Sequence, residues 1–118
     1  MRSDHLLLED ILDAIDEIRR YLPADRDAFD SDRPLQSHIY RHIMIVGEAA
    51  YRLSTTLKER HPETPWRLIE GMRHVLVHDY FQVDWDEVYR TAAHDIPKLQ
   101  PQIQDIADRL APETDESA

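Results

Sequence analysis

The sequence contains no cysteine, only two glycines, and no long uninterrupted run of apolar residues. Without cysteine the chain can form neither a disulfide framework nor a thiolate metal site, which is compatible with a reducing compartment. So few glycines argue against a turn-rich all-β fold. No apolar run approaches the roughly 18 residues of a membrane span, and the first residues lack the pattern of a secretory signal. We therefore expect a cytoplasmic protein without a membrane partner.

The charge is strongly acidic overall but unevenly distributed. The formal net charge of -10 disfavours a nucleic-acid ligand at first sight. Residues 1–32 hold 4 Lys/Arg against 10 Asp/Glu, residues 33–78 hold 7 against 4, and residues 79–118 hold 3 against 10. The middle segment is therefore locally basic and could hold a polyanion between acidic flanks. From charge alone, acidic helices that simply keep the protein soluble are the simpler explanation.

Apolar residues recur at steps of three or four through most of the chain, the period of amphipathic helices. Ser3 or Asp4 can cap the first helix, and Asp84 followed by Glu87 resembles a capping box at the start of the last one. Pro97 is expected to end or kink that helix. No segment shows the alternation of a β-strand. The apolar stripes cover residues 8–22, 35–57, 69–76 and 84–110, and the polar residues 23–32 predict a loop.

These stripes predict an all-α protein, an up-and-down bundle of four to five helices. Residues 1–111 form one domain in this interpretation, and residues 112–118 form a disordered tail. Thr64 is a suitable N-cap for the third helix. Gly47 lies inside the second helix, where glycine costs about 1 kcal/mol relative to alanine. This cost predicts a close contact at Gly47, within the chain or across a dimer.

The segment from 73 to 81 reads RHVLVHDYF. If the third helix continues through it, His74 and His78 share a face and Arg73 roughly aligns with Tyr80, because each residue turns about 100°. Arginine binds phosphate through a bidentate fork, and histidine exchanges protons near neutral pH. Cleavage of RNA without a metal needs one group to activate the ribose 2′-hydroxyl and another to stabilise charge on the phosphate. The alternative is that these side chains simply form a solvated helix face. In either case Glu48 could form an ion pair with Arg73.

A metal site is the other possible use of the histidines. His74 and His78, like His38 and His42, are four residues apart, a spacing that suits two metal ligands on a helix. The first pair lacks the glutamate of the H-E-x-x-H zinc signature, and Arg73 beside it would repel a cation. We therefore expect no metal and no cofactor, with His38 and His42 as neutral surface or groove residues that could line the same basic cleft.

At these residues the sequence resembles the HepT-like toxins of the HEPN superfamily. Three stretches carry the likeness: IVGEAAYRLS at 45–54, HPETPWRLIEGMR at 61–73, and RHVLVHDYFQVDWDEV at 73–88. Together with the terminal helices they cover nearly the whole chain. The short superfamily motif, R-x4-H, is common by chance, whereas its setting between PWR and YF-x-VD is fairly specific.

The family motif R-x4-H-x-Y matches Arg73, His78 and Tyr80, with His74 as the polar second residue. The resemblance implies that His78 transfers protons, that Arg73 binds and polarises the phosphate, and that His74 assists. It also implies that Tyr80 is the residue to which a partner transfers AMP. Two positions depart from the family, whose members often have asparagine at position 74 and glycine at position 79; here Asp79 places a carboxylate beside the phosphate site.

The resemblance further implies a metal-independent endoribonuclease, the toxin of a type VII toxin–antitoxin pair. Two chains would form a homodimer in which both motifs meet in one RNA-binding cleft. The antitoxin partner would resemble MntA, a minimal nucleotidyltransferase that uses ATP to modify Tyr80 and block the cleft, with higher-order assembly of the two proteins possible. The alternative hypotheses are a non-catalytic helical module that binds such a nucleotidyltransferase or its nucleotide, and a structural bundle without a ligand.

Overall fold

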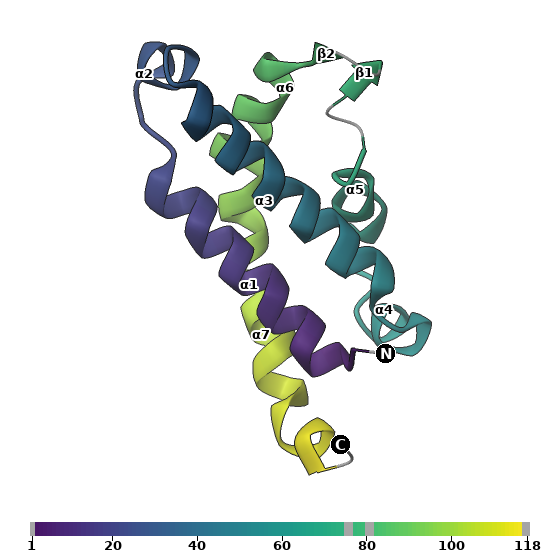
Figure 1. Cartoon of the computed structure of the whole chain (residues 1–118). Coiled ribbons are helices and arrows are strands. Elements are labelled where there is room, and N and C mark those ends of the chain that lie inside the picture. Colours follow the sequence, from purple (N-terminus) through teal and green to yellow (C-terminus); the bar gives the residue numbers. More distant parts are fainter. Residues whose placement is uncertain (1, 75–76, 80–81, 117–118) are drawn as a thin grey trace.

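Three long helices form the body of the molecule (Figure 1). The computed structural model describes residues 2–74, 77–79 and 82–116, and of residues 77–79 and 111–116 it describes the backbone alone. Helix α1 spans Asp4–Tyr21, α3 spans Arg33–Arg52 and α7 spans Ile96–Glu116. α1 runs antiparallel to both α3 and α7 and packs against each of them. The predicted all-α bundle is therefore confirmed.

The predicted cap of the first helix is confirmed, and the second long helix has a cap that was not predicted. The Ser3 hydroxyl accepts a hydrogen bond from the Leu6 backbone N–H at 3.2 Å, so Ser3 caps α1. Asp32 caps α3 in the same way through Leu35, with proline in the first turn. The apolar stripes of these helices form the core, in which Leu8, Ile11, Ile15, Ile18, Ile39, Ile43, Ile96 and Ile103 are fully buried.

The prediction of a loop at residues 23–32 is wrong in part. A short helix, α2, spans Arg26–Asp30 and is capped by Asp25. Phe29 on this helix has no exposed surface and lies edge-on against Tyr89 and Trp85, with ring centroids 5.1 Å and 6.3 Å away. One aromatic residue in a polar segment has no helical period, so its burial could not be predicted from the local pattern.

The second predicted stripe is divided between two helices. α3 ends at Arg52, and a separate helix, α4, spans Thr55–Arg60 after the N-cap Ser54. Lys58 on α4 donates hydrogen bonds to the carbonyls of Ala50 and Tyr51, at 3.0 Å and 3.3 Å, and to the Glu70 carboxylate at 2.7 Å. It therefore bonds two carbonyls in the last turn of α3, of which that of Ala50 also accepts from the Leu53 N–H, and it ties this turn to the helix that follows.

That next helix, α5, spans Trp66–Gly71 and is much shorter than predicted. Its N-cap is Pro65 and no side chain caps it, so the prediction of Thr64 as N-cap is wrong; Thr64 is buried instead. The helix is held at its start by Trp66, whose indole N–H donates to the His61 carbonyl at 3.0 Å. α5 packs on the second half of α3.

A short antiparallel hairpin follows α5 and was not predicted. Strand β1 spans Val77–Asp79 and β2 spans Gln82–Val83. Val77 pairs with Val83, and both are β-branched residues that favour strands. The register is irregular between Val77 and Asp79. The third helix therefore ends before β1. The predicted alignment of side chains across residues 73–80 required the helix to continue, so that alignment does not form.

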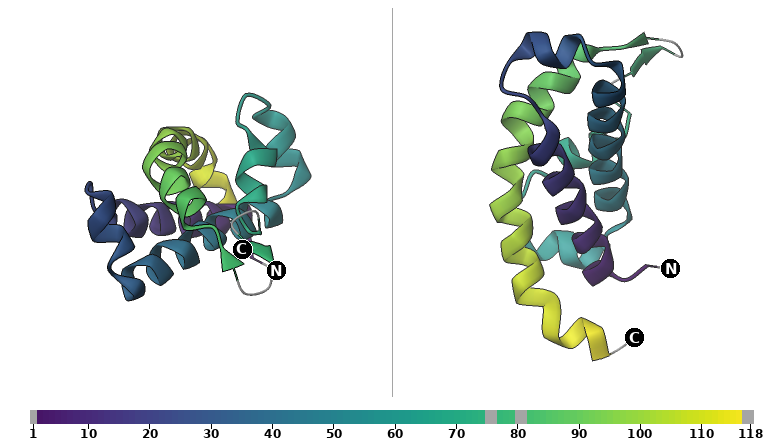
Figure 2. Two further views of the ribbon diagram at one scale, coloured as in Figure 1. Left: turned by 90° about the horizontal axis from the view of Figure 1, so that it is seen from above. Right: turned by 60° about the vertical axis from the view of Figure 1, so that its left-hand side comes forward.

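The last predicted helix forms one continuous rod with a local irregularity (Figure 2). Helix α6 spans Trp85–Arg90 and begins at Asp84, which accepts from the Glu87 N–H at 3.1 Å as predicted. A π-helical stretch, η1, spans Thr91–Asp95 and leads into α7. The Ile96 N–H bonds to the Thr91 carbonyl, five residues earlier, just before Pro97, which has no N–H to donate. Pro97 therefore does not end the helix.

The structure bears on two predictions for the chain, the absence of a membrane span and a domain boundary at residue 111. Within the described ranges, no helix is long and apolar enough to cross a membrane. The backbone of α7 extends to Glu116, beyond the predicted domain boundary at residue 111. The single domain of residues 1–111 and the disordered tail of residues 112–118 stay predictions.

Candidate functional site

Gly47 determines where Arg73 lies. A Cβ atom at position 47 would come 2.3 Å from the Arg73 backbone nitrogen and 2.9 Å from the Met72 carbonyl carbon. The predicted close contact at Gly47 is therefore confirmed, and it lies within the chain. Met72 is almost fully buried, and the Arg73 N–H donates to the Glu70 carbonyl at 3.3 Å. The backbone at Arg73 is thus pressed against α3 immediately after α5 ends.

The Arg73 side chain lies along α3 between Tyr51 and Glu48. Its guanidinium carbon is 3.5 Å from the centroid of the Tyr51 ring, a stacked cation–π contact. Its Nη1 atom is 3.9 Å from Glu48 Oε1, so the expected ion pair with Glu48 is confirmed as a long one. The other Glu48 oxygen accepts from Arg52 Nε at 2.8 Å. Glu48 therefore helps to orient the Arg73 guanidinium. Because Glu48 also pairs with Arg52, it offsets only part of the positive charge of Arg73.

The Arg73 guanidinium has unused hydrogen-bonding capacity. Its Nε atom is buried and, within the described part of the chain, has no hydrogen-bond partner. The side chain as a whole is 29% exposed, so the guanidinium is reached from solvent on one side. A buried N–H without an acceptor costs roughly 1–3 kcal/mol. An oxyanion on the exposed side of Arg73 would add a charge-assisted hydrogen bond to the guanidinium.

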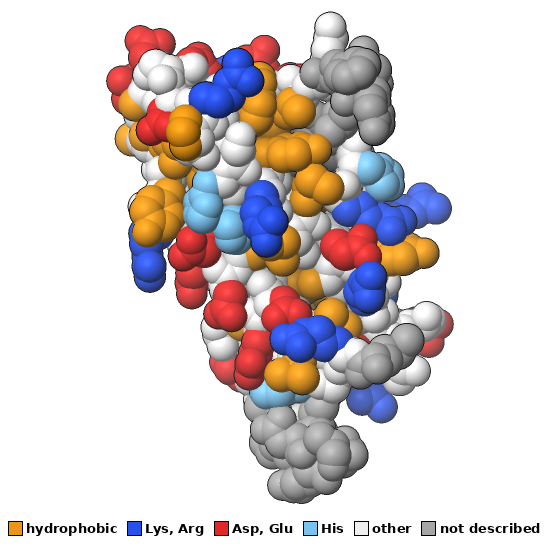
Figure 3. Space-filling view, in the orientation of Figure 1, with side chains coloured by type: hydrophobic (Ala, Val, Ile, Leu, Met, Phe, Trp, Pro, Cys, Tyr) orange, Lys and Arg blue, Asp and Glu red, His pale blue; other side chains and the backbone are white. Residues whose placement is uncertain are grey.

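Arg73 and His74 form one wall of an open pocket of about 650 Å³. The opposite wall is α3, and the pocket contains both basic and apolar side chains, as Figure 3 shows for the face over α3 and α5. His74 is exposed, and its N–H donates to the Gly71 carbonyl at 3.1 Å. The residues lining this pocket, called the Arg73 pocket below, are Tyr40, Arg41, Met44, Ile45, Glu48, Arg73 and His74.

The other two motif residues are placed only in part. His78 lies on β1, at the irregularity between the paired residues Val77 and Asp79, and its backbone alone is described. Tyr80 lies outside the described residues. The prediction that His74 and His78 share a helix face is wrong, because His74 lies in a turn and His78 lies on strand β1. The assignments of Arg73 and His78 as catalytic, of His74 as supporting and of Tyr80 as modified stay predictions.

His38 and His42 do not line the Arg73 pocket. Both lie on α3, but they face α1: His38 Nε2 is 3.0 Å from Glu17 Oε1. His42 lines a smaller pocket between α1 and α3 instead. The expectation that these two histidines belong to the basic cleft is therefore wrong. The two histidines lie on the part of α3 that faces α1, and Ile45, which lines both pockets, separates this part from the Arg73 pocket.

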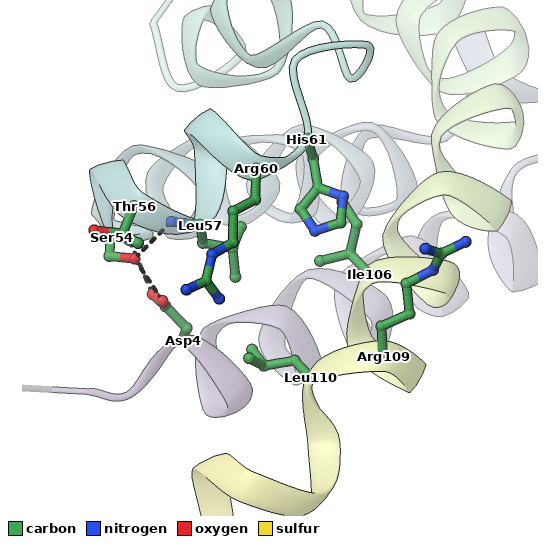
Figure 4. Close-up of a pocket in the computed structure, with 9 residues that line it drawn as sticks. All are labelled: Asp4, Ser54, Thr56, Leu57, Arg60, His61, Ile106, Arg109 and Leu110. Atoms are coloured by element: carbon green, nitrogen blue, oxygen red, sulfur yellow. Dashed lines mark hydrogen bonds between the residues drawn. The ribbon is translucent and has the colours of Figure 1, made fainter.

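A second pocket, of about 280 Å³, is lined by residues of α1, α4 and α7 (Figure 4), at the end of the bundle opposite the hairpin (Figure 1). Arg60 reaches it from α4 and Arg109 from α7. Asp4, which lines it, already accepts from the Ser54 N–H and hydroxyl at 2.9 Å and 2.6 Å. Of the two motif residues whose side chains the structure describes, Arg73 and His74, neither lines this pocket. Asp4 therefore ties α1 to the start of α4.

Three residues around Arg73, namely Arg41, Met44 and Tyr51, were not predicted, whereas the pairing of Glu48 with Arg73 was considered from the sequence. Arg41, Met44, Glu48 and Tyr51 follow one another on α3 at steps of three, four and three, which places them on one exposed helix face. This second stripe beside the buried one is visible in the sequence. Without the position of Arg73, however, it is indistinguishable from an ordinary solvent-exposed face.

A family model described as "Ribonuclease HepT-like" matches residues 11–106. The chain belongs to the ribonuclease HepT-like family. This confirms the resemblance on which the motif assignments depend. The matched range contains Gly47, the whole Arg73 pocket and the segment RHVLVHDYF.

Several curated HepT-like relatives match over nearly their whole length. A probable ribonuclease HepT of Thermococcus cleftensis is 35% identical over 106 residues, covering 89% of this chain and 96% of the relative. A putative RNase of Caldanaerobacter subterraneus is 33% identical, covering 90% and 96%. A putative RNase of Methanocaldococcus jannaschii is 30% identical, covering 89% and 91%. No solved structure matches significantly.

Proposed function

We propose that this HepT-like chain is a metal-independent endoribonuclease, the toxin of a type VII toxin–antitoxin pair. The observation that carries the proposal is the Arg73 guanidinium. It is stacked on Tyr51, turned towards an open pocket, and retains a buried Nε–H without an acceptor among the described residues. A phosphodiester is a ligand that matches the charge of the part of the guanidinium that faces the pocket. Family membership and the relatives' names point to RNA as the substrate.

The chemistry needs only groups of the motif. His78 takes the proton of a ribose 2′-hydroxyl, and the 2′-oxygen attacks the adjacent phosphorus. The bond from phosphorus to the 5′-oxygen breaks, and a protonated histidine returns a proton to that oxygen. Arg73 stabilises the negative charge that builds on the phosphoryl oxygens. His74, exposed at the rim of the pocket, positions the strand.

A second copy of the chain completes the cleft in this proposal. The Arg73 pocket is open to solvent, and its wall includes the apolar side chains of Met44 and Ile45 on α3. Tyr51 beside it is 50% exposed. Pairing of two chains over this face would cover the apolar surface and bring two Arg73 groups to one RNA strand. The homodimer would thus supply basic charge that a single acidic chain lacks.

Control by an antitoxin follows from the position of the motif tyrosine. Tyr80 comes two residues after His78 and directly after the strand β1. Transfer of AMP from ATP to its hydroxyl, by an MntA-like minimal nucleotidyltransferase, adds a phosphate and a base at the cleft. The added negative charge repels the RNA backbone, and the bulk excludes it.

The decisive experiment is RNA cleavage by purified protein in EDTA, after intact-mass analysis has established that Tyr80 is unmodified. Arg73→Ala and His78→Ala test the catalytic residues. Arg67→Ala is the matched control, because Arg67 is an exposed arginine on α5 that does not line the pocket. We expect cleavage by the wild type and by the control and almost none by the two motif variants.

Equal cleavage by all four proteins would refute the assignment and indicate a contaminating nuclease. Absence of cleavage by the unmodified dimer, together with tight capture of a nucleotidyltransferase or a nucleotide, would support the non-catalytic binding module instead. A second mass spectrum after incubation with the antitoxin and ATP tests the modification. An increase equal to one AMP, lost in Tyr80→Phe, is the expected result.

A further inference from the structure

Three potential metal ligands converge between α1 and α3, away from the Arg73 pocket. Glu17 lies on α1, and His38 and His42 lie one turn apart on α3. One ligand atom of each lies within 4.8 Å of the ligand atoms of the other two. All three residues are partly buried, so their side chains are held by neighbours yet reachable. Figure 3 shows histidine and acidic side chains side by side over this region.

The tautomer of His42 is set by its own hydrogen bond. His42 Nδ1 is 2.8 Å from the His38 backbone carbonyl oxygen, which can only accept. Nδ1 of His42 therefore carries a proton, and Nε2 is left with a lone pair whenever the ring is neutral. Histidines that bind metals commonly donate their other ring N–H to a carbonyl or carboxylate in this way. His42 thus has Nε2 as the ring nitrogen available to a metal.

The ligand atoms are close enough together to bind one small cation after a small movement. His38 Nε2 and Glu17 Oε1 are 3.0 Å apart. Two ligands at about 2.0–2.1 Å from a tetrahedral zinc ion lie roughly 3.4 Å apart, so a few tenths of an ångström of movement suffice. The His38 and His42 ring centroids are 4.3 Å apart, and a Tyr21 edge contacts the His38 ring. A shift of the His42 ring would complete the third ligand.

The surrounding charge favours a cation. A pocket of about 220 Å³ leads to His42 and is lined by Asp10, Asp13 and Glu17. The positive charge of Arg20 opposes cation binding only weakly. Its Nη1 atom is 3.8 Å from Glu17 Oε2, and its side chain is 66% exposed. Partly buried charges interact more strongly than solvated ones. Asp10 is already paired with Arg2, whose Nε atom is 2.6 Å from Asp10 Oδ2, so the charge that favours a cation comes mainly from Asp13 and Glu17.

We propose that Glu17, His38 and His42 bind one divalent transition-metal ion of the zinc class. Two imidazoles and one carboxylate suit zinc, cobalt or nickel, and hard cations such as Mg²⁺ are disfavoured because they prefer oxygen ligands. Three protein ligands leave a fourth position for water. The ion joins α1 to α3 across residues distant in sequence, so it stabilises the folded bundle. The alternative is a plain ion pair between Glu17 and His38.

The test is titration of tag-free, chelator-treated protein with ZnCl₂ by calorimetry, with thermal unfolding measured in parallel. The variants are His42→Ala and the conservative Glu17→Gln, each checked by circular dichroism. His94→Ala is the matched control, because His94 is an exposed histidine on η1 outside the cluster. Bound Co²⁺ provides a spectroscopic check, since its visible absorption reports nitrogen and oxygen coordination.

We expect one zinc ion per chain in the wild type and the control, with affinity at least tenfold weaker in both variants. At zinc concentrations about 100 times Kd, the melting temperature of the wild type should rise by on the order of 10 °C. No stoichiometric binding by the wild type, or equal binding by His42→Ala and Glu17→Gln, would overturn the proposal and leave the ion pair. RNA cleavage is assayed in EDTA, so it does not depend on zinc binding. The outcome of the zinc titration is therefore independent of the outcome for the proposed function.

Discussion

Gly47 lies against the backbone of Arg73, so closely that a Cβ atom at position 47 would be 2.3 Å from the Arg73 nitrogen. The contact joins the middle of α3 to the turn after α5. It brings the arginine that begins the family motif onto the face of α3 that holds Tyr51 and Glu48. The smallest residue in the helix therefore positions the strongest phosphate-binding group of the proposed site.

Replacing Gly47 by alanine should destabilise the protein and displace Arg73. Alanine gains about 1 kcal/mol of helix propensity, but its Cβ meets backbone atoms, which cannot rotate away, and overpacking costs about 1–3 kcal/mol. The free energy of unfolding from urea titration measures the balance, and RNA cleavage measures the displacement. Gly47→Ser should be worse than Gly47→Ala. An increase in stability for both would show that the close contact is not formed.

Arg73→Lys should lower kcat by roughly a hundredfold although it keeps the positive charge. Lysine is a point charge that cannot bind a phosphate through two parallel N–H groups or stack flat on Tyr51. Loss of one donor to a developing oxyanion costs about 10²–10³ in rate. Single-turnover cleavage, beside Arg67→Lys, checks this. A lysine variant as active as the wild type would mean that charge alone is needed.

Tyr51 should matter through its ring and not through its hydroxyl. The Arg73 guanidinium stacks on the ring face, and an exposed cation–π contact contributes about 0.5–1 kcal/mol. Tyr51→Phe should therefore retain activity, and Tyr51→Ala should lose a few-fold to tenfold through a less ordered Arg73. Steady-state kinetics of both variants decide the point. A defect of equal size in Tyr51→Phe would instead assign a role to the hydroxyl.

Phe29→Ala should destabilise the fold by about 3–5 kcal/mol, the usual cost of removing a buried aromatic side chain. Phe29 is fully buried and contacts Tyr89 and Trp85, so its loss opens a cavity between α2 and the start of the last helix. Chemical denaturation measures the effect. Ala28→Gly, on the exposed side of the same short helix, is the control and should cost about 1 kcal/mol or less. A small effect of Phe29→Ala would mean that α2 is not part of the core.

The core and most of the helix starts follow from the sequence. The apolar stripes of α1 and α3, the caps Ser3 and Asp84, and the close contact at Gly47 were all predictable, because they depend on residues within one or two helical turns or on the cost of one residue type. The resemblance in the motif segment likewise predicted the family.

The tertiary structure decided what local patterns cannot express. The segment after Gly71 turns and forms a hairpin, although its apolar residues continued the helical period, because the β-branched pair Val77 and Val83 meets across strands. Phe29 is buried only because α2 folds back onto Trp85 and Tyr89.

The tertiary structure also decided which residues surround the proposed sites. Tyr51 and Arg73 are 22 positions apart, and Glu17 and His42 are 25 apart, so no local period connects them. The sequence by itself determined which residue types were available and which helix faces were apolar. The packing of α5 against α3 and of α1 against α3 determined which polar groups meet, because a contact between distant segments depends on how whole helices are arranged.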